Sequence, residues 1–416
     1  FAFILHPTMS TPLPTPLSIC EPNQLHAMLL LATTTTPASP NLVLIDAVSS
    51  DVMPTQTIPS AICVRMDAFD IYRYENDEAE NSDTTASDSD GSTERKSSSK
   101  RREYDDPSDS GTRSSSVSAS SAVSATPSQT SNLPVLTYGN FNLRPAQQLR
   151  AALEALQITA TTRVVVFTQN FKTGVADPIT AARLAWCLCY CGVEDVQLLN
   201  GGFGAWTKQN YETVQVSSVV NHTALLSPTA PRVSFGTTLF PARPDFLAST
   251  EEVLAIVNQE QLGVLADARS WDEYVGQMHG YNFDLGCGRI PGARWGHWGP
   301  STYRGGDFSI ADHIGKLQKT SKIESFWIEW GIILPAASTA ENDRPIVFYC
   351  GSGWRSAMAW VMSQLLGLPN CKSYDGGFLE YNRLHPNAKN HVVESGVPLN
   401  LPKSELINKE EENKMT

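Results

Sequence analysis

The sequence is poor in several features, and each shortage argues against a class of protein. Basic side chains are scarce: 31 Lys and Arg stand against 43 Asp and Glu, for a formal net charge of −12. A surface that binds nucleic acid or anionic lipid needs clustered Lys and Arg, so we expect neither partner. No apolar run comes near the roughly 20 residues that cross a bilayer. The sequence therefore predicts a soluble protein with no membrane partner.

Cysteine is present but lacks the spacing of a structural staple. None of the 8 cysteines forms a C-x-x-C pair, and they are scattered through apolar segments. This argues against a disulfide framework and against a zinc site, and we expect no metal and no cofactor. A reducing, intracellular setting is favoured, cytoplasmic or mitochondrial. The first basic residue is Arg65, so early positive charge typical of a targeting segment is lacking, and the compartment stays open.

The composition changes abruptly between Glu75 and Asn132. This stretch is rich in Ser, Thr and Asp, and its 12 acidic and 6 basic side chains carry half of the net charge. A segment with so few large apolar residues cannot bury enough surface to offset the entropy of ordering its backbone. We expect a disordered insertion. A phosphorylated or partner-binding segment is the alternative reading.

Outside the insertion the chain contains an internal repeat. Each half has, in the same order, a buried strand pattern, an I-P-x-A turn, a second strand, an apolar helix and a G-G-F segment. The landmarks are NLVLIDAVSS (41–50), IPSA (58–61), RVVVF (163–167) and LLNGGFGAW (198–206), then GVLADARSW (263–271), IPGA (290–293), PIVFYC (345–350) and SYDGGFLEY (373–381). Short runs that are apolar on both faces suit a parallel sheet covered by helices. Each half is therefore predicted to be a doubly wound α/β unit with its crevice at the carboxyl ends of the strands.

One loop of the second half carries a candidate nucleophile. The expected strand 345–349 ends at Cys350-Gly351-Ser352-Gly353-Trp354-Arg355, and a helix is expected from about Ser356. Two glycines allow the backbone to curl so that successive N–H groups face inward as an anion-binding nest. The positive end of the helix and the guanidinium of Arg355 add to this field. All three favour a thiolate, so we predict that Cys350 is reactive.

These residues carry a family resemblance. The segments CGSGWR, LADARSWDEY, GRIPGA and YDGGFLEY of the second half, with the weaker LIDA, IPSA and LNGGFGAW of the first, resemble the tandem-domain rhodanese family of thiosulfate and 3-mercaptopyruvate sulfurtransferases. The resemblance implies two rhodanese-like domains, each a five-stranded parallel sheet flanked by helices, with a non-catalytic N-terminal domain. The expected parts are an N-terminal domain at 20–215 with its insertion at 75–132, a linker at 216–245, a catalytic domain at 246–402 and a charged tail at 403–416.

The resemblance also implies a mechanism. Cys350 would take the sulfane sulfur of a small anionic donor as a persulfide and pass it to cyanide or to a thiol acceptor such as thioredoxin or glutathione. Arg269 follows the strand 264–267 and is expected to reach the crevice and bind the donor; a surface ion pair with Asp272 or Glu273 is the alternative. The residues assigned to catalysis are Cys350, Arg355 and Ser352, and those assigned to substrate binding are Arg269, Gly351, Gly353 and Trp354.

The repeat explains why one half would be inactive. Aligning the strands places Thr168 at the position of Cys350 and Val48 at that of Arg269. The donor is less clearly indicated. Ser352 matches the mercaptopyruvate branch, but no Arg or Lys lies between Trp271 and Gly288 to hold a carboxylate. Both thiosulfate and 3-mercaptopyruvate therefore stay open.

Two other functions compete with sulfur transfer. A phosphatase of the Cdc25 type shares the fold, but its C-x5-R loop is one residue longer than the four-residue spacing between Cys350 and Arg355. The shorter loop argues against it, because phosphate needs a wider cradle. A non-enzymatic binding module is the other alternative. It would be expected to have lost its cysteine, whereas Cys350 and its loop are intact.

Overall fold

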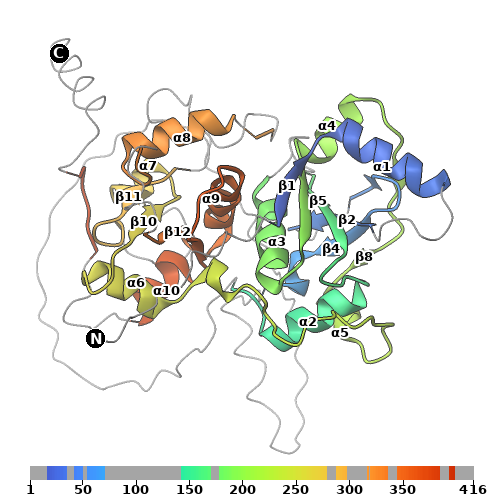
Figure 1. The fold of residues 1–416 in the computed structure, drawn as a ribbon, viewed down its shortest axis with the longest axis horizontal. Helices are drawn as coiled ribbons and strands as arrows, with labels where there is room; N and C mark the ends of the chain where they lie inside the picture. The colour runs from blue at the N-terminus through green and yellow to red at the C-terminus, as the bar shows by residue number, and fades with distance from the viewer. Residues whose placement is uncertain are drawn as a thin grey trace, which may run out of the picture. The chain divides into compact units, whose positions relative to one another are not determined.

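The computed structural model describes both halves of the repeat (Figure 1). The described residues are 16–34, 42–49, 54–70, 142–169, 178–278, 287–297, 316–317, 319–335, 344–384 and 393–398. The expected insertion at 75–132 and the expected tail at 403–416 lie outside these ranges. The described residues of both halves belong to one compact unit. Within the described ranges, no helix is both long and apolar enough to cross a bilayer.

The first half is built on a parallel sheet of six strands in the order β1-β6-β5-β2-β4-β8. Its strands are β1 (Leu17–Cys20), β2 (Leu42–Val48), β4 (Ile62–Arg65), β5 (Arg163–Phe167), β6 (Asp195–Leu199) and β8 (Val219–Val220). Five strands were expected, and the sixth is β8, which pairs with β4 at the edge. It comes from residues 216–245, which were expected to be a linker but add this strand to the first sheet. A short antiparallel pair, β3 (Gln56–Thr57) and β7 (Val214–Gln215), lies outside the sheet.

The second half repeats this arrangement with five parallel strands in the order β11-β10-β12-β13-β9. They are β9 (Leu247–Ala248), β10 (Val264–Asp267), β11 (Arg294–Trp295), β12 (Ile346–Tyr349) and β13 (Cys371–Tyr374). The register matches as well, since Asp46 lies opposite Phe167 in the first sheet and Asp267 lies opposite Tyr349 in the second. The α/β fold class and the internal repeat are therefore confirmed. The next residues along these strands, Thr168 and Cys350, occupy equivalent positions.

Helices cover the sheets because the strands are apolar on both sides. In the second sheet Ala266 and Phe348 belong to one buried cluster, whereas their neighbours Leu265 and Val347 belong to another. Alternate residues of a strand face opposite sides, so a continuous apolar run needs a cover on each face. The helices are α1 (Pro22–Thr34), α2 (Ala146–Ala155), α3 (Pro178–Cys191), α4 (Gly202–Lys208), α5 (His222–Leu226), α6 (Thr250–Val257), α7 (Trp271–Tyr274), α8 (Thr320–Glu329), α9 (Trp354–Leu365) and α10 (Gly377–Leu384), with short 3₁₀ turns at Met66–Ala68 and Pro244–Phe246.

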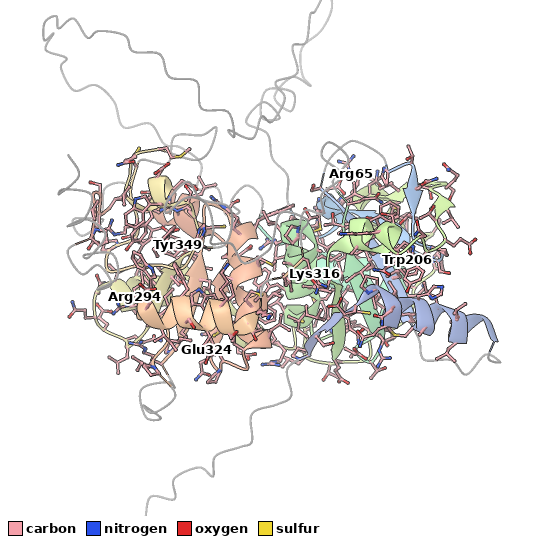
Figure 2. All side chains as sticks on the ribbon, turned by 90° about the horizontal axis from the view of Figure 1, so that it is seen from above. Arg65, Trp206, Arg294, Lys316, Glu324 and Tyr349 are labelled. Atoms are coloured by element: carbon pink, nitrogen blue, oxygen red, sulfur yellow. The ribbon has the colours of Figure 1, made fainter. Side chains whose placement is uncertain are left out.

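Two equivalent helices, α3 and α9, pack against each other and join the halves (Figure 1). Their apolar residues form one continuous buried cluster that includes Trp186, Met358 and Trp360. The indole Nε1 of Trp186 donates to the carbonyl of Phe246 at 3.2 Å, and the Phe246 ring lies edge-on to Trp360. Away from this contact each half has its own interior, in which Trp206 and Tyr349 are buried (Figure 2). The covering helix of one half is therefore also a core element of the other.

Two helices of the second half begin at serine caps. Ser249 accepts a hydrogen bond from the N–H of Glu252 at 3.2 Å and opens α6. The Glu252 carboxylate then pairs with Lys372 at 2.8 Å. A complete capping box is found at Ser270 and Glu273, which opens the short helix α7. This second box holds a carboxylate beside the candidate site.

Candidate active site

The backbone that follows β12 is held by the first turn of α10. The N–H of Phe378 donates to the carbonyl of Cys350 at 2.7 Å, and the N–H of Leu379 donates to the carbonyl of Gly351 at 3.0 Å. In a trans peptide the carbonyl and the following N–H point in opposite directions. These two bonds therefore turn the N–H groups of Gly351 and Ser352 away from α10. This is the orientation that an anion-binding nest on the other side of the loop needs.

Glycine is required at two points of this arrangement. Gly353 has φ +84° and stands at the N-terminus of α9, and a Cβ there would lie 2.5 Å from the carbonyl oxygen of Asp375. Gly377 has φ +56°, and a Cβ there would lie 2.6 Å from the carbonyl oxygen of Cys350. Any side chain would therefore collide with backbone in a conformation that L-residues rarely adopt. The close approach of loop and helix depends on both glycines.

The thiol of Cys350 is buried at the base of the loop and is 1% exposed. Its Sγ lies 3.9 Å from the hydroxyl oxygen of Ser356, the third residue of α9. Ser356 in turn shares a 2.8 Å hydrogen bond with Ser373 on the neighbouring strand β13. A pair of buried hydroxyls thus lies on one side of the sulfur, where a serine can donate a hydrogen bond to a thiolate.

Arg355 closes the loop and is paired with a carboxylate. Its two terminal nitrogens donate to the two carboxylate oxygens of Glu273 at 2.6 and 2.8 Å. The capping box of α7 fixes this carboxylate, because Glu273 also accepts from the N–H and the hydroxyl of Ser270. Burial alone would raise the pKa of Glu273, but Arg355, and then Arg269, lower it to about 2. The expected positive charge of Arg355 is present and is balanced by a buried negative one.

Arg269 lies elsewhere than predicted. Its guanidinium donates to both carboxylate oxygens of Asp267, at 2.9 and 2.6 Å, and to the carbonyl of Gly288 at 2.6 Å. The residue is 1% exposed, and its guanidinium lies over the ring of Phe378. Burial would lower the pKa of Arg269, but Asp267 raises it above its ordinary value. The expectation of an arginine that reaches the crevice to meet a donor is thus corrected: Arg269 ties the end of β10 to the segment 287–297. Neither Asp272 nor Glu273 takes it as the principal partner.

The remaining predicted residues lie within the loop itself. Ser352 is 8% exposed, and Gly351 and Gly353 are buried beside it. Trp354 is the first residue of α9, half-buried, and packs against the core cluster shared with α3. The structure therefore gathers Cys350 and its loop with Arg355 but buries Arg269 among Asp267, Gly288 and Phe378.

Residues that the sequence reasoning passed over complete the site. Glu273, Ser356 and Asp375 contact the loop or its thiol, Ser373 contacts Ser356, and Arg183 reaches the loop from α3. One of them carried a usable signal: Ser270-Trp271-Asp272-Glu273 has the S-x-x-E spacing of a capping box, which predicts a fixed carboxylate. The others are buried polar residues with no motif that marks them, and Arg183 lies 170 positions from its partner Gly353.

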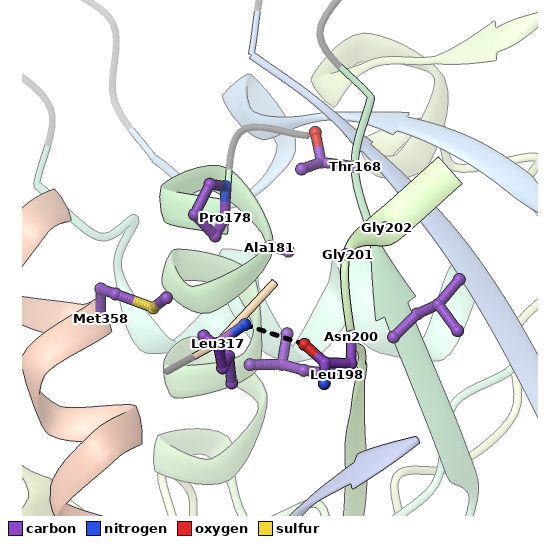
Figure 3. A pocket seen from close by; sticks show the side chains of 10 residues that line it. Thr168, Pro178, Ala181, Leu198, Asn200, Gly201, Gly202, Leu317 and Met358 are labelled. Carbon is purple, nitrogen blue, oxygen red and sulfur yellow. Dashed lines mark hydrogen bonds between the residues drawn. The ribbon is translucent and has the colours of Figure 1, made fainter. Parts of the chain in front are cut away.

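The first half holds a counterpart of this site without its chemistry. A small pocket is lined by residues that include Thr168, Asn200, Leu317 and Met358 (Figure 3). Thr168 replaces the cysteine, and its hydroxyl donates to the carbonyl of Ala47 at 2.9 Å. Asn200 replaces Asp375 and accepts from the N–H of Leu317 at 2.9 Å, as Figure 3 shows. The counterpart has a hydroxyl where the second half has a thiol.

Fold and loop together define a class: an α/β protein with a cysteine loop at the carboxyl edge of a parallel sheet. Residues 249–384 match the family described as the rhodanese-like domain. Relatives include thiosulfate sulfurtransferase YnjE of Escherichia coli, 29% identical over 240 residues, which are 57% of this chain and 48% of that protein. Another is the sulfur carrier protein TtuD of Thermus thermophilus, 28% identical over 247 residues, 57% of this chain and 74% of that protein.

A solved structure shares the fold. The anaerobic ergothioneine biosynthesis enzyme from Chlorobium limicola superimposes with a TM-score of 0.58 at 24% identity, covering 91% of this chain and 70% of the other. The chain spans about half the length of its E. coli relative, 48%. The match to the rhodanese-like domain family thus covers residues 249–384 of the second half.

Proposed function

We propose that the protein is a sulfurtransferase that carries sulfur as a persulfide on Cys350. The observation that supports this most directly is the loop: a cysteine at a strand end, followed by peptide groups whose carbonyls are bonded to α10 and whose N–H groups face the other way. Such a loop stabilises an anion at its centre, either a thiolate or the terminal sulfur of a persulfide. The names of the E. coli and T. thermophilus relatives point to the same chemistry.

The reaction would proceed in two displacements. The Cys350 thiolate attacks the outer sulfur of thiosulfate; the new S–S bond forms as the bond to the sulfonate sulfur breaks, and sulfite leaves with the electron pair. A nucleophilic acceptor, cyanide or a thiolate, then attacks the outer sulfur of the persulfide and returns the Cys350 thiolate. Ser356, at 3.9 Å from the sulfur, would donate a hydrogen bond to the thiolate while accepting one from Ser373.

Donor recognition is assigned to the loop and Arg355. Because Glu273 neutralises the charge of Arg355, the guanidinium would orient the donor rather than attract it through a net charge. Arg269 would support the site indirectly, through its ion pair with Asp267 at the end of β10. Thiosulfate is the proposed donor, with 3-mercaptopyruvate as the second candidate because Ser352 matches that branch. A thiol such as that of thioredoxin or glutathione is the proposed acceptor.

The test measures sulfite release from thiosulfate and pyruvate release from 3-mercaptopyruvate, each with cyanide as acceptor. Cys350→Ser should abolish both, and Cys287→Ser, which removes a half-buried thiol, should retain them. Mass spectrometry should find one added sulfur atom on the Cys350 peptide after incubation with thiosulfate. A wild-type protein that gains no sulfur, or a Cys350→Ser variant with full turnover, would refute the proposal. Turnover of p-nitrophenyl phosphate would favour a phosphatase instead.

A further inference from the structure

A buried arginine of the first half is bonded to the cysteine loop of the second. Arg183 lies on α3 and is 0% exposed. Its Nε and Nη2 donate to the two carboxylate oxygens of Asp70, at 3.0 and 2.9 Å. Its Nη1 donates to the carbonyl of Gly353 at 3.3 Å, and Nη2 forms an ion pair with Asp375 at 2.6 Å. One guanidinium thus joins a carboxylate of its own half to two groups beside the loop.

Asp375 packs directly on the loop that Arg183 reaches. A Cβ added to Gly353 would lie 2.5 Å from the carbonyl oxygen of Asp375, 2.9 Å from its Oδ1 and 3.0 Å from Nη1 of Arg183. The other carboxylate oxygen of Asp375 accepts from the N–H of Leu143 at 2.9 Å. Arg183 and Asp375 both lie close to the backbone of Gly353, which has no side chain. We therefore expect a shift of either residue to displace the backbone of the loop.

The carbonyl of Gly353 accepts two hydrogen bonds of 3.3 Å, one from Nη1 of Arg183 and one from the N–H of Ala357 in the first turn of α9. This carbonyl faces Arg183, so the N–H of Trp354 on the same trans peptide points the opposite way. With the carbonyls of Cys350 and Gly351 bonded to α10, three of the first four carbonyls of the loop have fixed partners. Only one of these partners comes from the first half, and that partner is Arg183.

The repeat provides an internal comparison. Arg183 lies 17 residues before Asn200, and Met358 lies 17 residues before Asp375. Each faces the other half's site: Arg183 contacts the working loop, whereas Met358 lines the pocket around Thr168 (Figure 3). The loop of Cys350 is therefore contacted by a cation, Arg183, with which Asp375 pairs. The equivalent site at Thr168 is contacted by the thioether of Met358 and has the uncharged Asn200.

We propose that Arg183 is a positioning residue for sulfur transfer, which holds the peptide between Gly353 and Trp354 so that the loop's N–H groups face the sulfur of Cys350. This inference rests on the function proposed above. It gives the first half a part in the chemistry, although Thr168 stands there in place of the nucleophilic cysteine. The N-terminal half then acts as more than a structural partner.

The experiment compares two variants that differ only at Arg183. Asp70→Asn keeps Arg183 and its contacts with Gly353 and Asp375, and serves as the control. The double variant combines Asp70→Asn with Arg183→Met, which is the residue found at the equivalent position 358. Loss of Arg183 would leave the carboxylates of Asp70 and Asp375 without a counter-charge, and Asp70→Asn removes one of them. Arg183→Lys is the second test, because it keeps the charge but lacks the fork that reaches both carboxylates and the carbonyl. Each variant is checked for an intact fold by near-ultraviolet circular dichroism.

Two rates are measured at pH 7: turnover of thiosulfate and alkylation of Cys350 by iodoacetamide, followed on the Cys350 peptide. Relative to Asp70→Asn, the double variant should lose about 10- to 100-fold in kcat, the range expected when a reacting group is displaced by about 1 Å. KM should change less than kcat, and alkylation should slow. Arg183→Lys should show the same pattern to a smaller extent.

A folded double variant with the kcat and alkylation rate of Asp70→Asn would overturn the inference, as would wild-type rates in Arg183→Lys. The alkylation rate needs no sulfur donor, so it decides the role of Arg183 even if the wild type releases no sulfite. A wild type that releases no sulfite would overturn the proposed function, not the role of Arg183.

Discussion

Glu273 offers the sharpest test of the site's electrostatics. Its side chain is 4% exposed and its carboxylate is paired with Arg355 through two hydrogen bonds. Arg355 and Arg269 outweigh burial and hold its pKa at about 2, whereas an unfolded glutamate titrates at about 4.3. A carboxyl whose pKa is lowered on folding stabilises the protein at any pH above its pKa in the unfolded state. This stabilisation is lost as the pH falls towards its pKa in the folded state.

The magnitude follows from the two pKa values. At about 1.4 kcal/mol for each pH unit between them, the ionised carboxylate contributes about 3 kcal/mol at pH 7. Glu273→Gln keeps the shape but removes the charge, so its free energy of unfolding at pH 7 should be about 3 kcal/mol lower than that of the wild type. At pH 3 the wild type has lost about half of this contribution, and the difference should shrink to about 1.5 kcal/mol.

Urea unfolding at pH 7, 4.5 and 3 measures these differences. Glu260→Gln is the matched control, since Glu260 is an exposed glutamate of the same half. The control should differ from the wild type by less than about 0.5 kcal/mol at every pH. A Glu273→Gln variant that behaves like the control, or whose deficit does not shrink on acidification, would refute the assignment of a buried Glu273–Arg355 pair.

Two further predictions concern residues around the sheets' carboxyl edges. Asp46 is the counterpart of Asp267 but has Val48 in place of an arginine, and burial raises its pKa to about 7 despite hydrogen bonds from Thr57 and Gln169. A carboxyl with a raised pKa stabilises the fold at low pH and loses this contribution as the pH rises. The free energy of unfolding of the wild type should therefore fall by up to about 4 kcal/mol between pH 4 and 7. Urea unfolding of Asp46→Asn should not show this decrease. Gly377→Ala would place its Cβ 2.6 Å from the carbonyl oxygen of Cys350, so sulfite release should fall about 10- to 100-fold. Gly367→Ala is its control, because Gly367 also has a positive φ, +68°, but a Cβ there would meet nothing within 4 Å. Equal activity losses in the two variants would contradict the loop-contact argument.

The repeat, the parallel sheets and the position of Cys350 could be predicted from the sequence because each depends on local order. Apolar runs of four to seven residues indicate buried strands, and their repetition in the same sequence order fixes the equivalence of Thr168 and Cys350. Glycines beside the cysteine indicate a loop that must bend sharply, and Gly353 does have a positive φ. The strand β8 was missed because it has only two residues, too few for any period to appear.

Charge partners, by contrast, were decided by the tertiary structure alone. Arg355 pairs with Glu273, 82 positions away, and Arg183 bonds to Gly353, 170 positions away. Arg269 lay two residues after Asp267, and only burial at the sheet edge made that neighbour its principal partner. A sequence determines which side chains can carry charge and which segments can form strands. Which charges meet depends on packing between elements far apart in the chain. In this protein that packing brings Arg183 of the first half, where Thr168 takes the position of Cys350, to the loop of the second half.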